Sequence, residues 1–487
     1  MRGLIDDDLG SSCVREHGSM EEKSYCLVLS GGGAKGVYHV GMWRALQELG
    51  IQTDCYVGNS IGAIIAAFLA QGLGSELEDL GNRIGIDYIL NVPEDLIENG
   101  ELKVGVNPSS FRKFYKSLSL RGLDTSPLRA LLNSYIDEKT LRESGNDFGV
   151  VTVNVSDMKS REVYLEDIEE GELINYVLAS SAFPGFESPQ IGGKKYVDGG
   201  LYDNIPFAMA KARGYKRFII VDISGMGINR RPDISGVETI YIKNSINMGG
   251  VLDFNREFLD DYILLGYLDT MKTFERYVGH SYFFVPDEIA EAAFTLNLES
   301  MAAREVVEAH ARRHKGKPEG SLAQLVKSVF PRHSKHHRNW MAVFADAAAM
   351  ILDMPRIRPW DYREFAREAR LKAMESLEAI EALNDEGWKA LEAGIRAEIK
   401  ERRFLRTPYF YHLFLDAFLP GPIAHPLEAL MAEMYPELPA GLCMVEFLMG
   451  AMPMEDVLGD VGWNTQEEVW VLDGEEDLFP AIHENGK

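Results

Sequence analysis

Short apolar runs alternate with amphipathic segments along the first half of the chain, which predicts strands and helices in turn. Runs of apolar and β-branched residues predict strands at 25–30, 54–57, 149–155, 217–223 and 239–243. Apolar residues at helical spacing predict helices at 37–49, 61–73, 173–180 and 205–212. This alternation is typical of an α/β fold, with a mainly parallel central sheet between two helical layers.

The second half changes to long helical stretches broken by prolines. We therefore place a boundary near Gly249 or Gly250, with an α/β domain over 25–249 and a mainly α-helical C-terminal region over 250–487, whose role the sequence does not indicate. Strong helix formers with opposite charges at helical spacing predict one long, partly exposed helix over 363–403.

Four further segments are open to two interpretations each. Prolines break residues 87–147 into short helices, which form either a lid over a site or a packed crossover between strands. The basic, His-rich stretch 331–338 is a solvated loop or a contact for anionic headgroups or a metal. The aromatic stretch 409–419 is a core helix or an interfacial segment, and the Met-rich stretch 442–452 is ordinary core or an adaptable pocket.

Composition narrows the classes of function. The 487 residues are 46% hydrophobic and 26% charged, as expected of a globular protein of two domains. With 50 Lys and Arg against 75 Asp and Glu, the formal net charge of -25 argues against a nucleic-acid partner and against general affinity for anionic membranes. The four cysteines lack C-x-x-C spacing, which indicates neither a disulfide framework nor a zinc site and fits a reducing, cytoplasmic compartment.

Two segments resemble targeting or membrane signals at first sight. Residues 1–24 contain Asp6, Asp7 and Asp8 but no apolar run, so we take them as a non-native or disordered tail and not as a secretory signal. Residues 55–75 carry no charge, but glycines and polar residues interrupt them. We expect a buried strand and a buried helix there, and no transmembrane helix. Peripheral contact with a membrane and the oligomeric state stay open.

A serine lies between two glycines where the second predicted strand ends and a helix begins. The segment reads Gly58, Asn59, Ser60, Ile61, Gly62. This is the G-x-S-x-G form of a nucleophile elbow, in which the glycines let the serine occupy a strained turn with its hydroxyl exposed. The partial positive charge of a helix N-terminus would favour an oxyanion that develops beside Ser60.

A glycine-rich loop follows the first predicted strand, with the residues Gly31, Gly32, Gly33, Ala34, Lys35 and Gly36. Backbone N–H groups without large side chains around them suit an oxyanion hole. Because the carboxyl ends of parallel strands meet at one edge of a sheet, we expect this loop and Ser60 to lie together. Lys35 is the only charge in the loop, and we expect it to orient the loop rather than to contact a phosphate.

A serine nucleophile needs a base, and two residues are candidates. His39 lies within a predicted helix, where it faces a packed neighbour as easily as a substrate. Asp198 is the stronger candidate, because Gly199 and Gly200 directly after it allow the backbone to approach another loop closely. An exposed aspartate, with a pKa of about 3.9, is a weak base. We therefore expect Asp198 to be shielded from water, which raises its pKa, and to be hydrogen-bonded to Ser60.

The glycine loop, the elbow and the Asp198 triplet resemble, in order and spacing, the motifs of patatin-like phospholipases. Residues 179–186 and 203–206 are similar to the segments that flank the family's aspartate, and the resemblance covers about 25–245. It implies a three-layer α/β/α hydrolase domain with a Ser-Asp dyad that cleaves fatty-acyl esters, as a phospholipase A, lysophospholipase or carboxylesterase does. Ser60 would be the nucleophile and Asp198 the base.

The resemblance also implies the rest of the site. N–H groups near Gly32, Gly33 and Ala34 would hold the oxyanion, no metal or organic cofactor would be needed, and the substrate would be a phospholipid or another acyl-ester lipid. Asn59 stands where the family often has threonine, which would alter the hydrogen bonds around the elbow. Ile61 replaces a smaller residue, which would narrow the acyl entrance.

Three other functions stay open. An acyltransferase would use the same acyl-enzyme with an acceptor other than water. Gly31, Gly33 and Gly36 also match the G-x-G-x-x-G fingerprint of a nucleotide-binding oxidoreductase, but Asp54, the acid at about the right distance, begins the second strand instead of ending it. A non-catalytic lipid-binding protein would have no chemical reason to keep both the serine and the aspartate.

Overall fold

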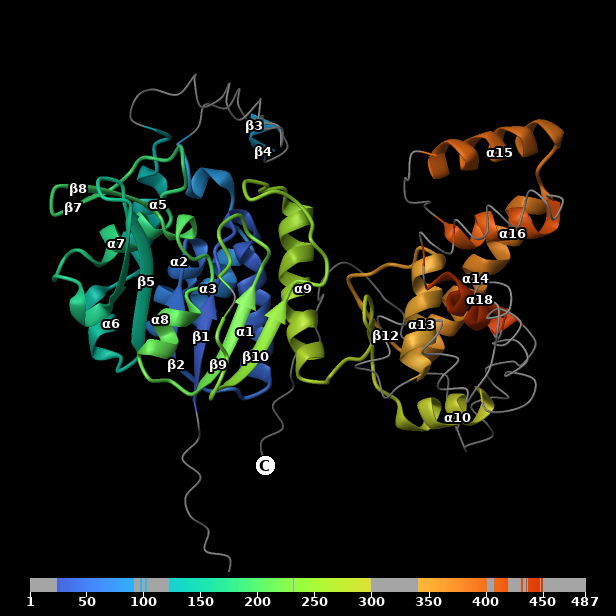
Figure 1. The fold of residues 1–487 in the computed structure, drawn as a ribbon, viewed down its shortest axis with the longest axis horizontal. Helices are drawn as coiled ribbons and strands as arrows, with labels where there is room; N and C mark the ends of the chain where they lie inside the picture. Colours follow the sequence, from blue (N-terminus) through green and yellow to red (C-terminus); the bar gives the residue numbers. More distant parts are fainter. Residues whose placement is uncertain are drawn as a thin grey trace, which may run out of the picture.

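The computed structural model describes residues 24–91, 97–98, 101–102, 122–230, 232–298, 340–400, 407–418, 431, 435, 437–446 and 448–449. An eight-stranded sheet lies at the centre of the first unit among these residues (Figure 1). Neighbouring strands run parallel in the spatial order β10 (Glu238–Lys243), β9 (Arg217–Asp222), β1 (Tyr25–Leu29), β2 (Thr53–Gly58) and β5 (Asp147–Asn154). Antiparallel pairing extends the sheet beyond β5 with β6 (Lys159–Tyr164), β8 (Lys194–Asp198) and β7 (Gln190–Ile191).

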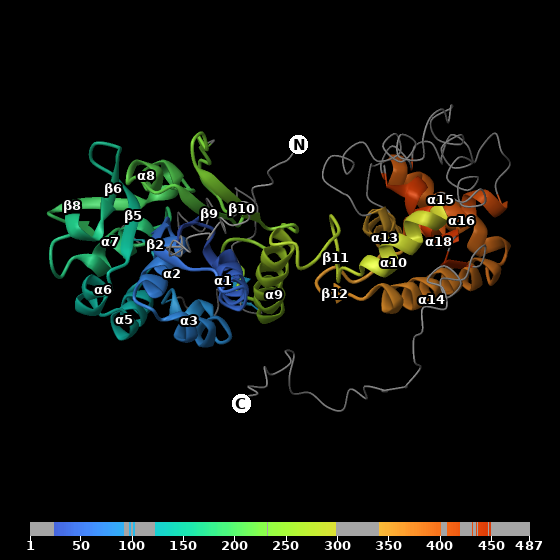
Figure 2. The same ribbon diagram turned by 90° about the horizontal axis from the view of Figure 1, so that it is seen from below.

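Helices cover both faces of the sheet, because alternate residues of each strand point to opposite sides. In β1, Leu27 and Leu29 enter the larger core, whereas Cys26 and Val28 enter a smaller core on the other face. The larger core is covered by α1 (Tyr38–Glu48), α2 (Ile61–Ala70), α3 (Gly74–Gly81), α5 (Ser126–Tyr135), α7 (Leu173–Ser180) and α9 (Arg256–Thr273), and the smaller one by α8 (Phe207–Ala212). Figure 2 shows α1, α2 and α3 on one side of the sheet and α8 on the other.

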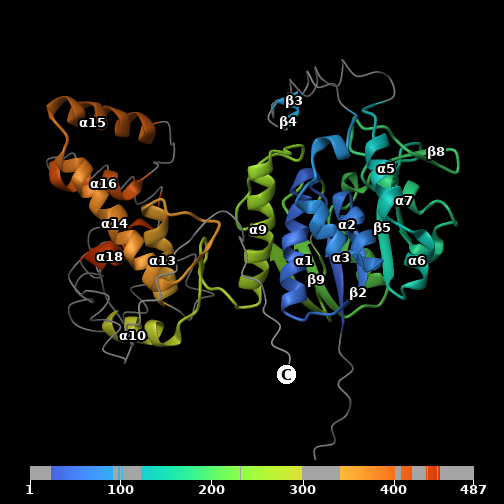
Figure 3. The same ribbon diagram turned by 180° about the vertical axis from the view of Figure 1, so that it is seen from behind.

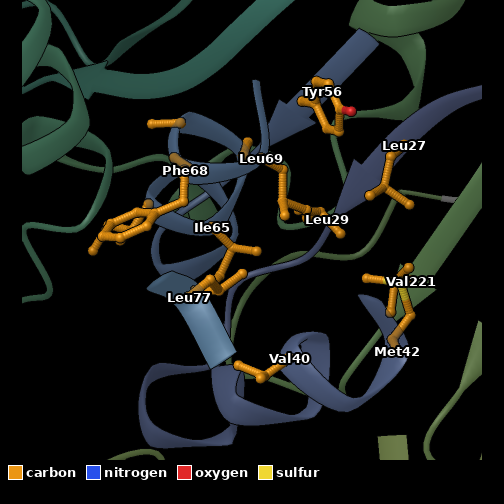
Figure 4. Packing of buried hydrophobic residues seen from close by; sticks show 14 of the residues in the cluster. Leu27, Leu29, Val40, Met42, Tyr56, Ile65, Phe68, Leu69, Leu77 and Val221 are labelled. Atoms are coloured by element: carbon orange, nitrogen blue, oxygen red, sulfur yellow. The ribbon is translucent and has the colours of Figure 1, made fainter. Parts of the chain in front are cut away.

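The larger core is closely packed around α2, which is apolar along its whole length. Figure 4 shows Ile65, Phe68 and Leu69 of this helix among the strand residues Leu27 and Leu29. These five side chains are almost completely buried. The uncharged stretch 55–75 is therefore a buried strand and a buried helix, as its sequence predicts. Among the described residues, no helix combines the length and the apolar character that crossing a membrane requires.

Helix α9 packs on α1 through two glycines. A Cβ atom at Gly41 would lie 1.8 Å from the carbonyl oxygen of Ile263, and one at Gly266 would lie 2.1 Å from that of Tyr38. The backbones can approach this closely only because both positions lack a side chain. Figure 3 shows α9 alongside α1. The core of the first unit therefore continues beyond the boundary expected near Gly249 or Gly250.

The remaining described helices form a second hydrophobic core of their own. They are α10 (Glu288–Leu298), α13 (Trp340–Ile351), α14 (Tyr362–Glu381), α15 (Asp385–Lys400), α16 (Pro408–Phe418) and α18 (Leu438–Glu446). Two short parallel strands, β11 (Phe283–Phe284) and β12 (Pro359–Trp360), accompany them. The helical character expected of this region is confirmed.

The prediction of one continuous helix over 363–403 is wrong. The chain forms α14 and α15 instead, with a break after Ala382. The side chain of Asn384 accepts a hydrogen bond from the N–H of Gly387 at 2.9 Å, as a helix N-cap does. The strong helix formers and the charge spacing on either side of Asn384 favoured one continuous helix over a helix start at this residue.

The segments with two interpretations are settled in part. In α5, Leu128 and Leu132 are buried in the larger core, so this part of 87–147 is packed structure. In α16, Tyr409 and Leu415 are buried in the helical core, as expected of a core helix, and so is Met444 of α18. The stretch 331–338 and residues 1–23 lie outside the described part of the chain.

Candidate active site

Ser60 occupies a strained turn between β2 and α2. Its φ of 55° and ψ of -128° are in a region that residues with a side chain rarely adopt. A Cβ atom at Gly58 would lie 2.2 Å from the carbonyl oxygen of Gly62, and one at Gly62 would lie 2.4 Å from that of Leu29. Both flanking glycines are thus required by close backbone contacts. The geometry is that of a nucleophile elbow.

A residue at the end of α7 stabilises this turn. The backbone N–H of Ser60 donates a hydrogen bond to Oγ of Ser180 at 3.0 Å. Ser180 is the last residue of α7 and is completely buried. We did not predict this contact from the sequence, although a polar residue at the end of an apolar helix is a signal that could have pointed to it.

Asp198 ends β8, beside the elbow. Its side chain is buried, and burial raises the pKa of the carboxyl group. Hydrogen bonds from the backbone N–H of Gly200 and the side chain of Asn59, together with the nearby hydroxyl of Ser60, favour the charged form and act in the opposite direction. The net effect is a raised pKa, so this aspartate is a stronger base than an exposed one.

The side chain of Asn59 connects Asp198 to the loop that contains Asn204. Its side chain is completely buried, and Nδ2 donates hydrogen bonds to Oδ1 of Asp198 and to Oδ1 of Asn204, each at 3.2 Å. A threonine hydroxyl at this position has only one proton to donate. The departure at Asn59 therefore does change the hydrogen bonds around the elbow.

Asn204 connects the glycine loop to the other two motifs. Its backbone carbonyl accepts a hydrogen bond from the N–H of Gly31 at 3.3 Å, and its Nδ2 donates to the carbonyl oxygen of Gly31 at 3.3 Å. Through Asn59 the same side chain reaches the elbow and Asp198. The sequence places Asn204 in a segment that flanks the aspartate, but we assigned it no role from the sequence.

The glycine loop offers fewer free N–H groups than its sequence suggests. The N–H of Ala34 donates to the carbonyl oxygen of Val251 at 2.8 Å, and that of Gly31 is bound to Asn204. Ala34, expected to donate to the oxyanion, is thus occupied in this structure. The N–H groups of Gly32 and Gly33 have no acceptor within the described residues. Within the loop, these two N–H groups therefore stay available to an oxyanion.

The side chains of Lys35 and His39 make contacts that support the fold. Nζ of Lys35 donates to Oδ1 of Asn247 at 2.6 Å, and burial lowers the pKa of this lysine. His39 is completely buried, with Nε2 3.1 Å from the carbonyl oxygen of Ser30, and burial lowers its pKa to about 4. Neither side chain lines the cavity beside Ser60.

A cavity of about 1090 Å³, part of it open to solvent, begins at Ser60 and Asp198. Its walls are almost entirely apolar and come mainly from α1, α2, α3, α5 and the segments after α7 and β10. They include Val40, Ile61, Ile65, Phe68, Leu77, Leu80, Leu128, Leu131, Phe183, Phe186, Val251, Leu252 and Phe254. Ile61 contacts the glycine loop closely, since a Cβ atom at Gly36 would lie 2.1 Å from its Cγ1. An apolar chain bound here would have its polar end at the serine.

Comparison with known families gives a match for part of this unit. The model of the patatin-like phospholipase family matches residues 27–211. These residues are similar to a patatin-like phospholipase domain.

Relatives of the patatin-like domain are found in much longer proteins. Lysophospholipase NTE1 of Coccidioides immitis is 31% identical over 208 residues, which are 42% of this chain and 12% of that protein. Patatin-like phospholipase domain-containing protein 6 of Homo sapiens is 26% identical over 200 residues, or 40% of this chain and 13% of that protein. The crystal structure of VipD from Legionella pneumophila aligns at 16% identity and a TM-score of 0.32, over 88% of this chain and 92% of that one.

The described residues contain no cluster of three or more His, Cys, Asp or Glu side chains that could hold a metal ion. Asp54, the acid that a dinucleotide fingerprint would use, lies near the start of β2, where it accepts a hydrogen bond from Ser24. The fold brings together Ser60, Asp198 and the glycine loop, but not Asp54.

Proposed function

We propose that this protein is a lipid acyl hydrolase in which Ser60 is the nucleophile and Asp198 the general base. Similarity to the patatin-like family supports hydrolysis of lipid acyl esters in general. The observation that carries the finer proposal is the position of a strained serine beside a buried aspartate at the polar end of an apolar cavity.

The first half of the reaction forms an acyl-enzyme. Oγ of Ser60 attacks the carbonyl carbon of the ester while its proton passes to Asp198. The free N–H groups of Gly32 and Gly33 hold the negative charge on the carbonyl oxygen. The C–O bond then breaks, and the leaving alcohol takes the proton from Asp198.

The second half releases the fatty acid. Water gives a proton to Asp198 and attacks the acyl carbonyl carbon, and Ser60 leaves with that proton when the bond to its oxygen breaks. The raised pKa of Asp198 helps it to accept a proton in each half, while its hydrogen bonds keep the carboxylate oriented. The apolar walls hold the acyl chain throughout.

Labelling with a fluorophosphonate tests the nucleophile. We expect the full-length protein to be labelled, Ser60→Ala to lose labelling entirely, and Asp198→Asn to react at least about 100-fold more slowly, since a general base contributes that much or more. Ser181→Ala is the matched control, because this serine also lines the cavity but donates its hydroxyl to the carbonyl oxygen of Val177. Labelling that persists in Ser60→Ala would refute the assignment.

The acyl acceptor is tested with the same protein. The release of fatty acid should depend on Ser60 with each of three substrates: phosphatidylcholine, lysophosphatidylcholine and a short-chain p-nitrophenyl ester. Addition of a lysolipid or glycerol distinguishes hydrolysis from transfer. If labelled acyl chains appear mainly on the added alcohol and not as free acid, the protein is an acyltransferase.

A further inference from the structure

Three large apolar side chains are exposed on two loops that each contribute a residue, Asn204 or Met226, to the lining of the cavity. Leu201 is 46% exposed, Met226 is 58% exposed and Ile228 is 55% exposed. They belong to two loops, 199–204 after β8 and 223–230 after β9. Isolated exposed apolar residues are common in proteins, but several on two adjoining loops indicate a contact surface.

The two loops are fixed to each other by backbone hydrogen bonds. The N–H of Ile228 donates to the carbonyl oxygen of Gly200, and the N–H of Asn204 donates to the carbonyl oxygen of Ile228, both at 2.9 Å. Gly227 permits this contact, since a Cβ atom there would lie 2.9 Å from Cβ of Asn204. Leu201 and Ile228 are therefore exposed on backbone that is held in place.

The exposed surface continues into the cavity. Met226 lines the cavity together with Ser60 and Asp198 and is at the same time the most exposed of the three side chains. An apolar ligand could thus pass from this surface to the serine along apolar side chains. Within the described part of these two loops the one cationic side chain is Arg230, which is stacked on Tyr202 at 3.9 Å and donates to its carbonyl oxygen.

We propose that Leu201, Met226 and Ile228 insert into the surface of a zwitterionic phospholipid bilayer and hold the cavity opening there. This inference rests on the proposed function, since it assumes that the substrate is a membrane lipid. Insertion removes three apolar side chains from water and lets an acyl chain enter the cavity without crossing the solvent. The net charge of -25 favours a zwitterionic surface over an anionic one.

Ile228→Asp and Leu201→Asp in the full-length protein test this inference. Each variant places a charge where the proposal needs an apolar side chain. Ile289→Asp is the matched control, because Ile289 is 53% exposed but lies on α10. Co-sedimentation with phosphatidylcholine vesicles, release of fatty acid from the same vesicles and hydrolysis of a soluble p-nitrophenyl ester are measured for each protein.

We expect each loop variant to lose about tenfold or more in vesicle binding and in vesicle hydrolysis, as the burial of one large apolar side chain implies. Hydrolysis of the soluble ester should stay within about twofold of wild type, and Ile289→Asp should match wild type in every assay. Unchanged vesicle binding in both loop variants would overturn the inference. So would an equal loss on the soluble ester, which would indicate damage to the site itself.

Three further outcomes are informative. Tighter binding to phosphatidylserine than to phosphatidylcholine vesicles, lost in high salt, would overturn the inference in favour of electrostatic docking. A change in sedimentation coefficient of the loop variants without vesicles would identify a second copy of the chain as the occupant of this surface. If the wild type binds vesicles through these residues but hydrolyses no ester, the proposed function fails while the docking surface stands.

Discussion

The side-chain amide of Asn204 forms hydrogen bonds both to the glycine loop and to the elbow. Its Nδ2 donates to the carbonyl oxygen of Gly31, and its Oδ1 accepts from Asn59. All of this is buried, and a buried polar group without a partner costs more than a hydrogen bond contributes. The position of the glycine loop relative to Ser60 thus depends in part on the side chain of Asn204, to which our scheme gives no chemical step.

Replacing Asn204 by Ala should impair both stability and turnover. The lost partners of Gly31 and Asn59 should lower the free energy of unfolding by about 1–3 kcal/mol. Because the glycine loop then moves relative to Ser60, we expect kcat for a soluble ester to fall more than KM rises. Urea unfolding and steady-state kinetics measure the two effects. The exposed Asn229→Ala is the control, and equal behaviour of the two variants would contradict this role.

Burial of Asp198 predicts the acid limb of the pH profile. The protonated carboxyl cannot accept a proton, so kcat/KM should fall as the pH drops through a pKa that burial raises above the usual 3.8. Asp203, whose burial raises its pKa to about 6, is the neighbouring group that could be mistaken for the base. Asp203→Asn should leave the midpoint of the profile unchanged. A midpoint that disappears in this variant would assign the titration to Asp203.

Unfolding at low pH must be separated from this effect. A carboxyl with a raised folded pKa binds its proton more tightly in the folded state, so Asp198 and Asp203 stabilise the fold at low pH and lose that contribution as the pH rises. His39 acts in the opposite sense, because its lowered pKa of about 4 makes the fold lose stability as the pH falls from about 6.5 toward 4. Circular dichroism along the pH profile distinguishes loss of activity from loss of fold.

At the scale of elements, the contact between α1 and α9 depends on two glycines. Gly41→Ala would place a Cβ atom 1.8 Å from the carbonyl oxygen of Ile263, so the helices must separate. We expect a loss of about 1–3 kcal/mol in the free energy of unfolding, as overpacking causes. Gly394→Ala in α15 is the control, because nothing lies within 4 Å of a Cβ atom there. The control should be neutral or stabilised by up to about 1 kcal/mol, since alanine favours helices.

Thermal or urea unfolding compares the two alanine variants. If Gly41→Ala is as stable as Gly394→Ala, the helices have room to adjust and the close approach is not required. Ester hydrolysis is a second readout of this contact, because α9 also packs against the short helix Gly33–Val37 at the glycine loop. Loss of ester hydrolysis should therefore accompany the loss of stability.

At the scale of the whole molecule, α9 extends the core of the first unit beyond Gly250. Leu259, Tyr262, Leu265 and Leu268 of this helix are completely buried in the core that contains the sheet. A chain that ends at Gly250 loses all four and exposes the facing side of α1. We expect it to aggregate or to bind the dye ANS strongly. A chain that ends at Val285 keeps α9, and should fold and react with a fluorophosphonate.

The opposite outcome would show that α9 is not required. If the chain that ends at Gly250 folds cooperatively and is labelled at Ser60 as the full-length protein is, the boundary expected from composition is sufficient and α9 is dispensable. Failure of both shortened chains would mean that the second helical core supports the first.

Much of the fold is encoded in local pattern. The apolar runs at 25–30 and 217–223 became β1 and β9, because a strand buried on both faces needs apolar residues at successive positions. Ser60 and Asp198 could also be singled out as candidates, since each lies in a glycine-flanked motif whose backbone shape is a local property. The start of α15 at Asn384 was present in the sequence as well, but the helix formers around it outweighed it.

Contacts between distant segments were decided only by the tertiary structure. The acceptor of the Ala34 N–H is Val251, and no pattern near Ala34 indicates that residue. The same holds for Ser180 at the elbow and for the packing of α9 on α1. Periodicity and turn motifs reflect interactions within a few residues, so the sequence by itself determined most of the elements and the two candidate residues, Ser60 and Asp198. Which N–H groups remain free, and where the core of the first unit ends, depends on segments that meet only when the chain has folded.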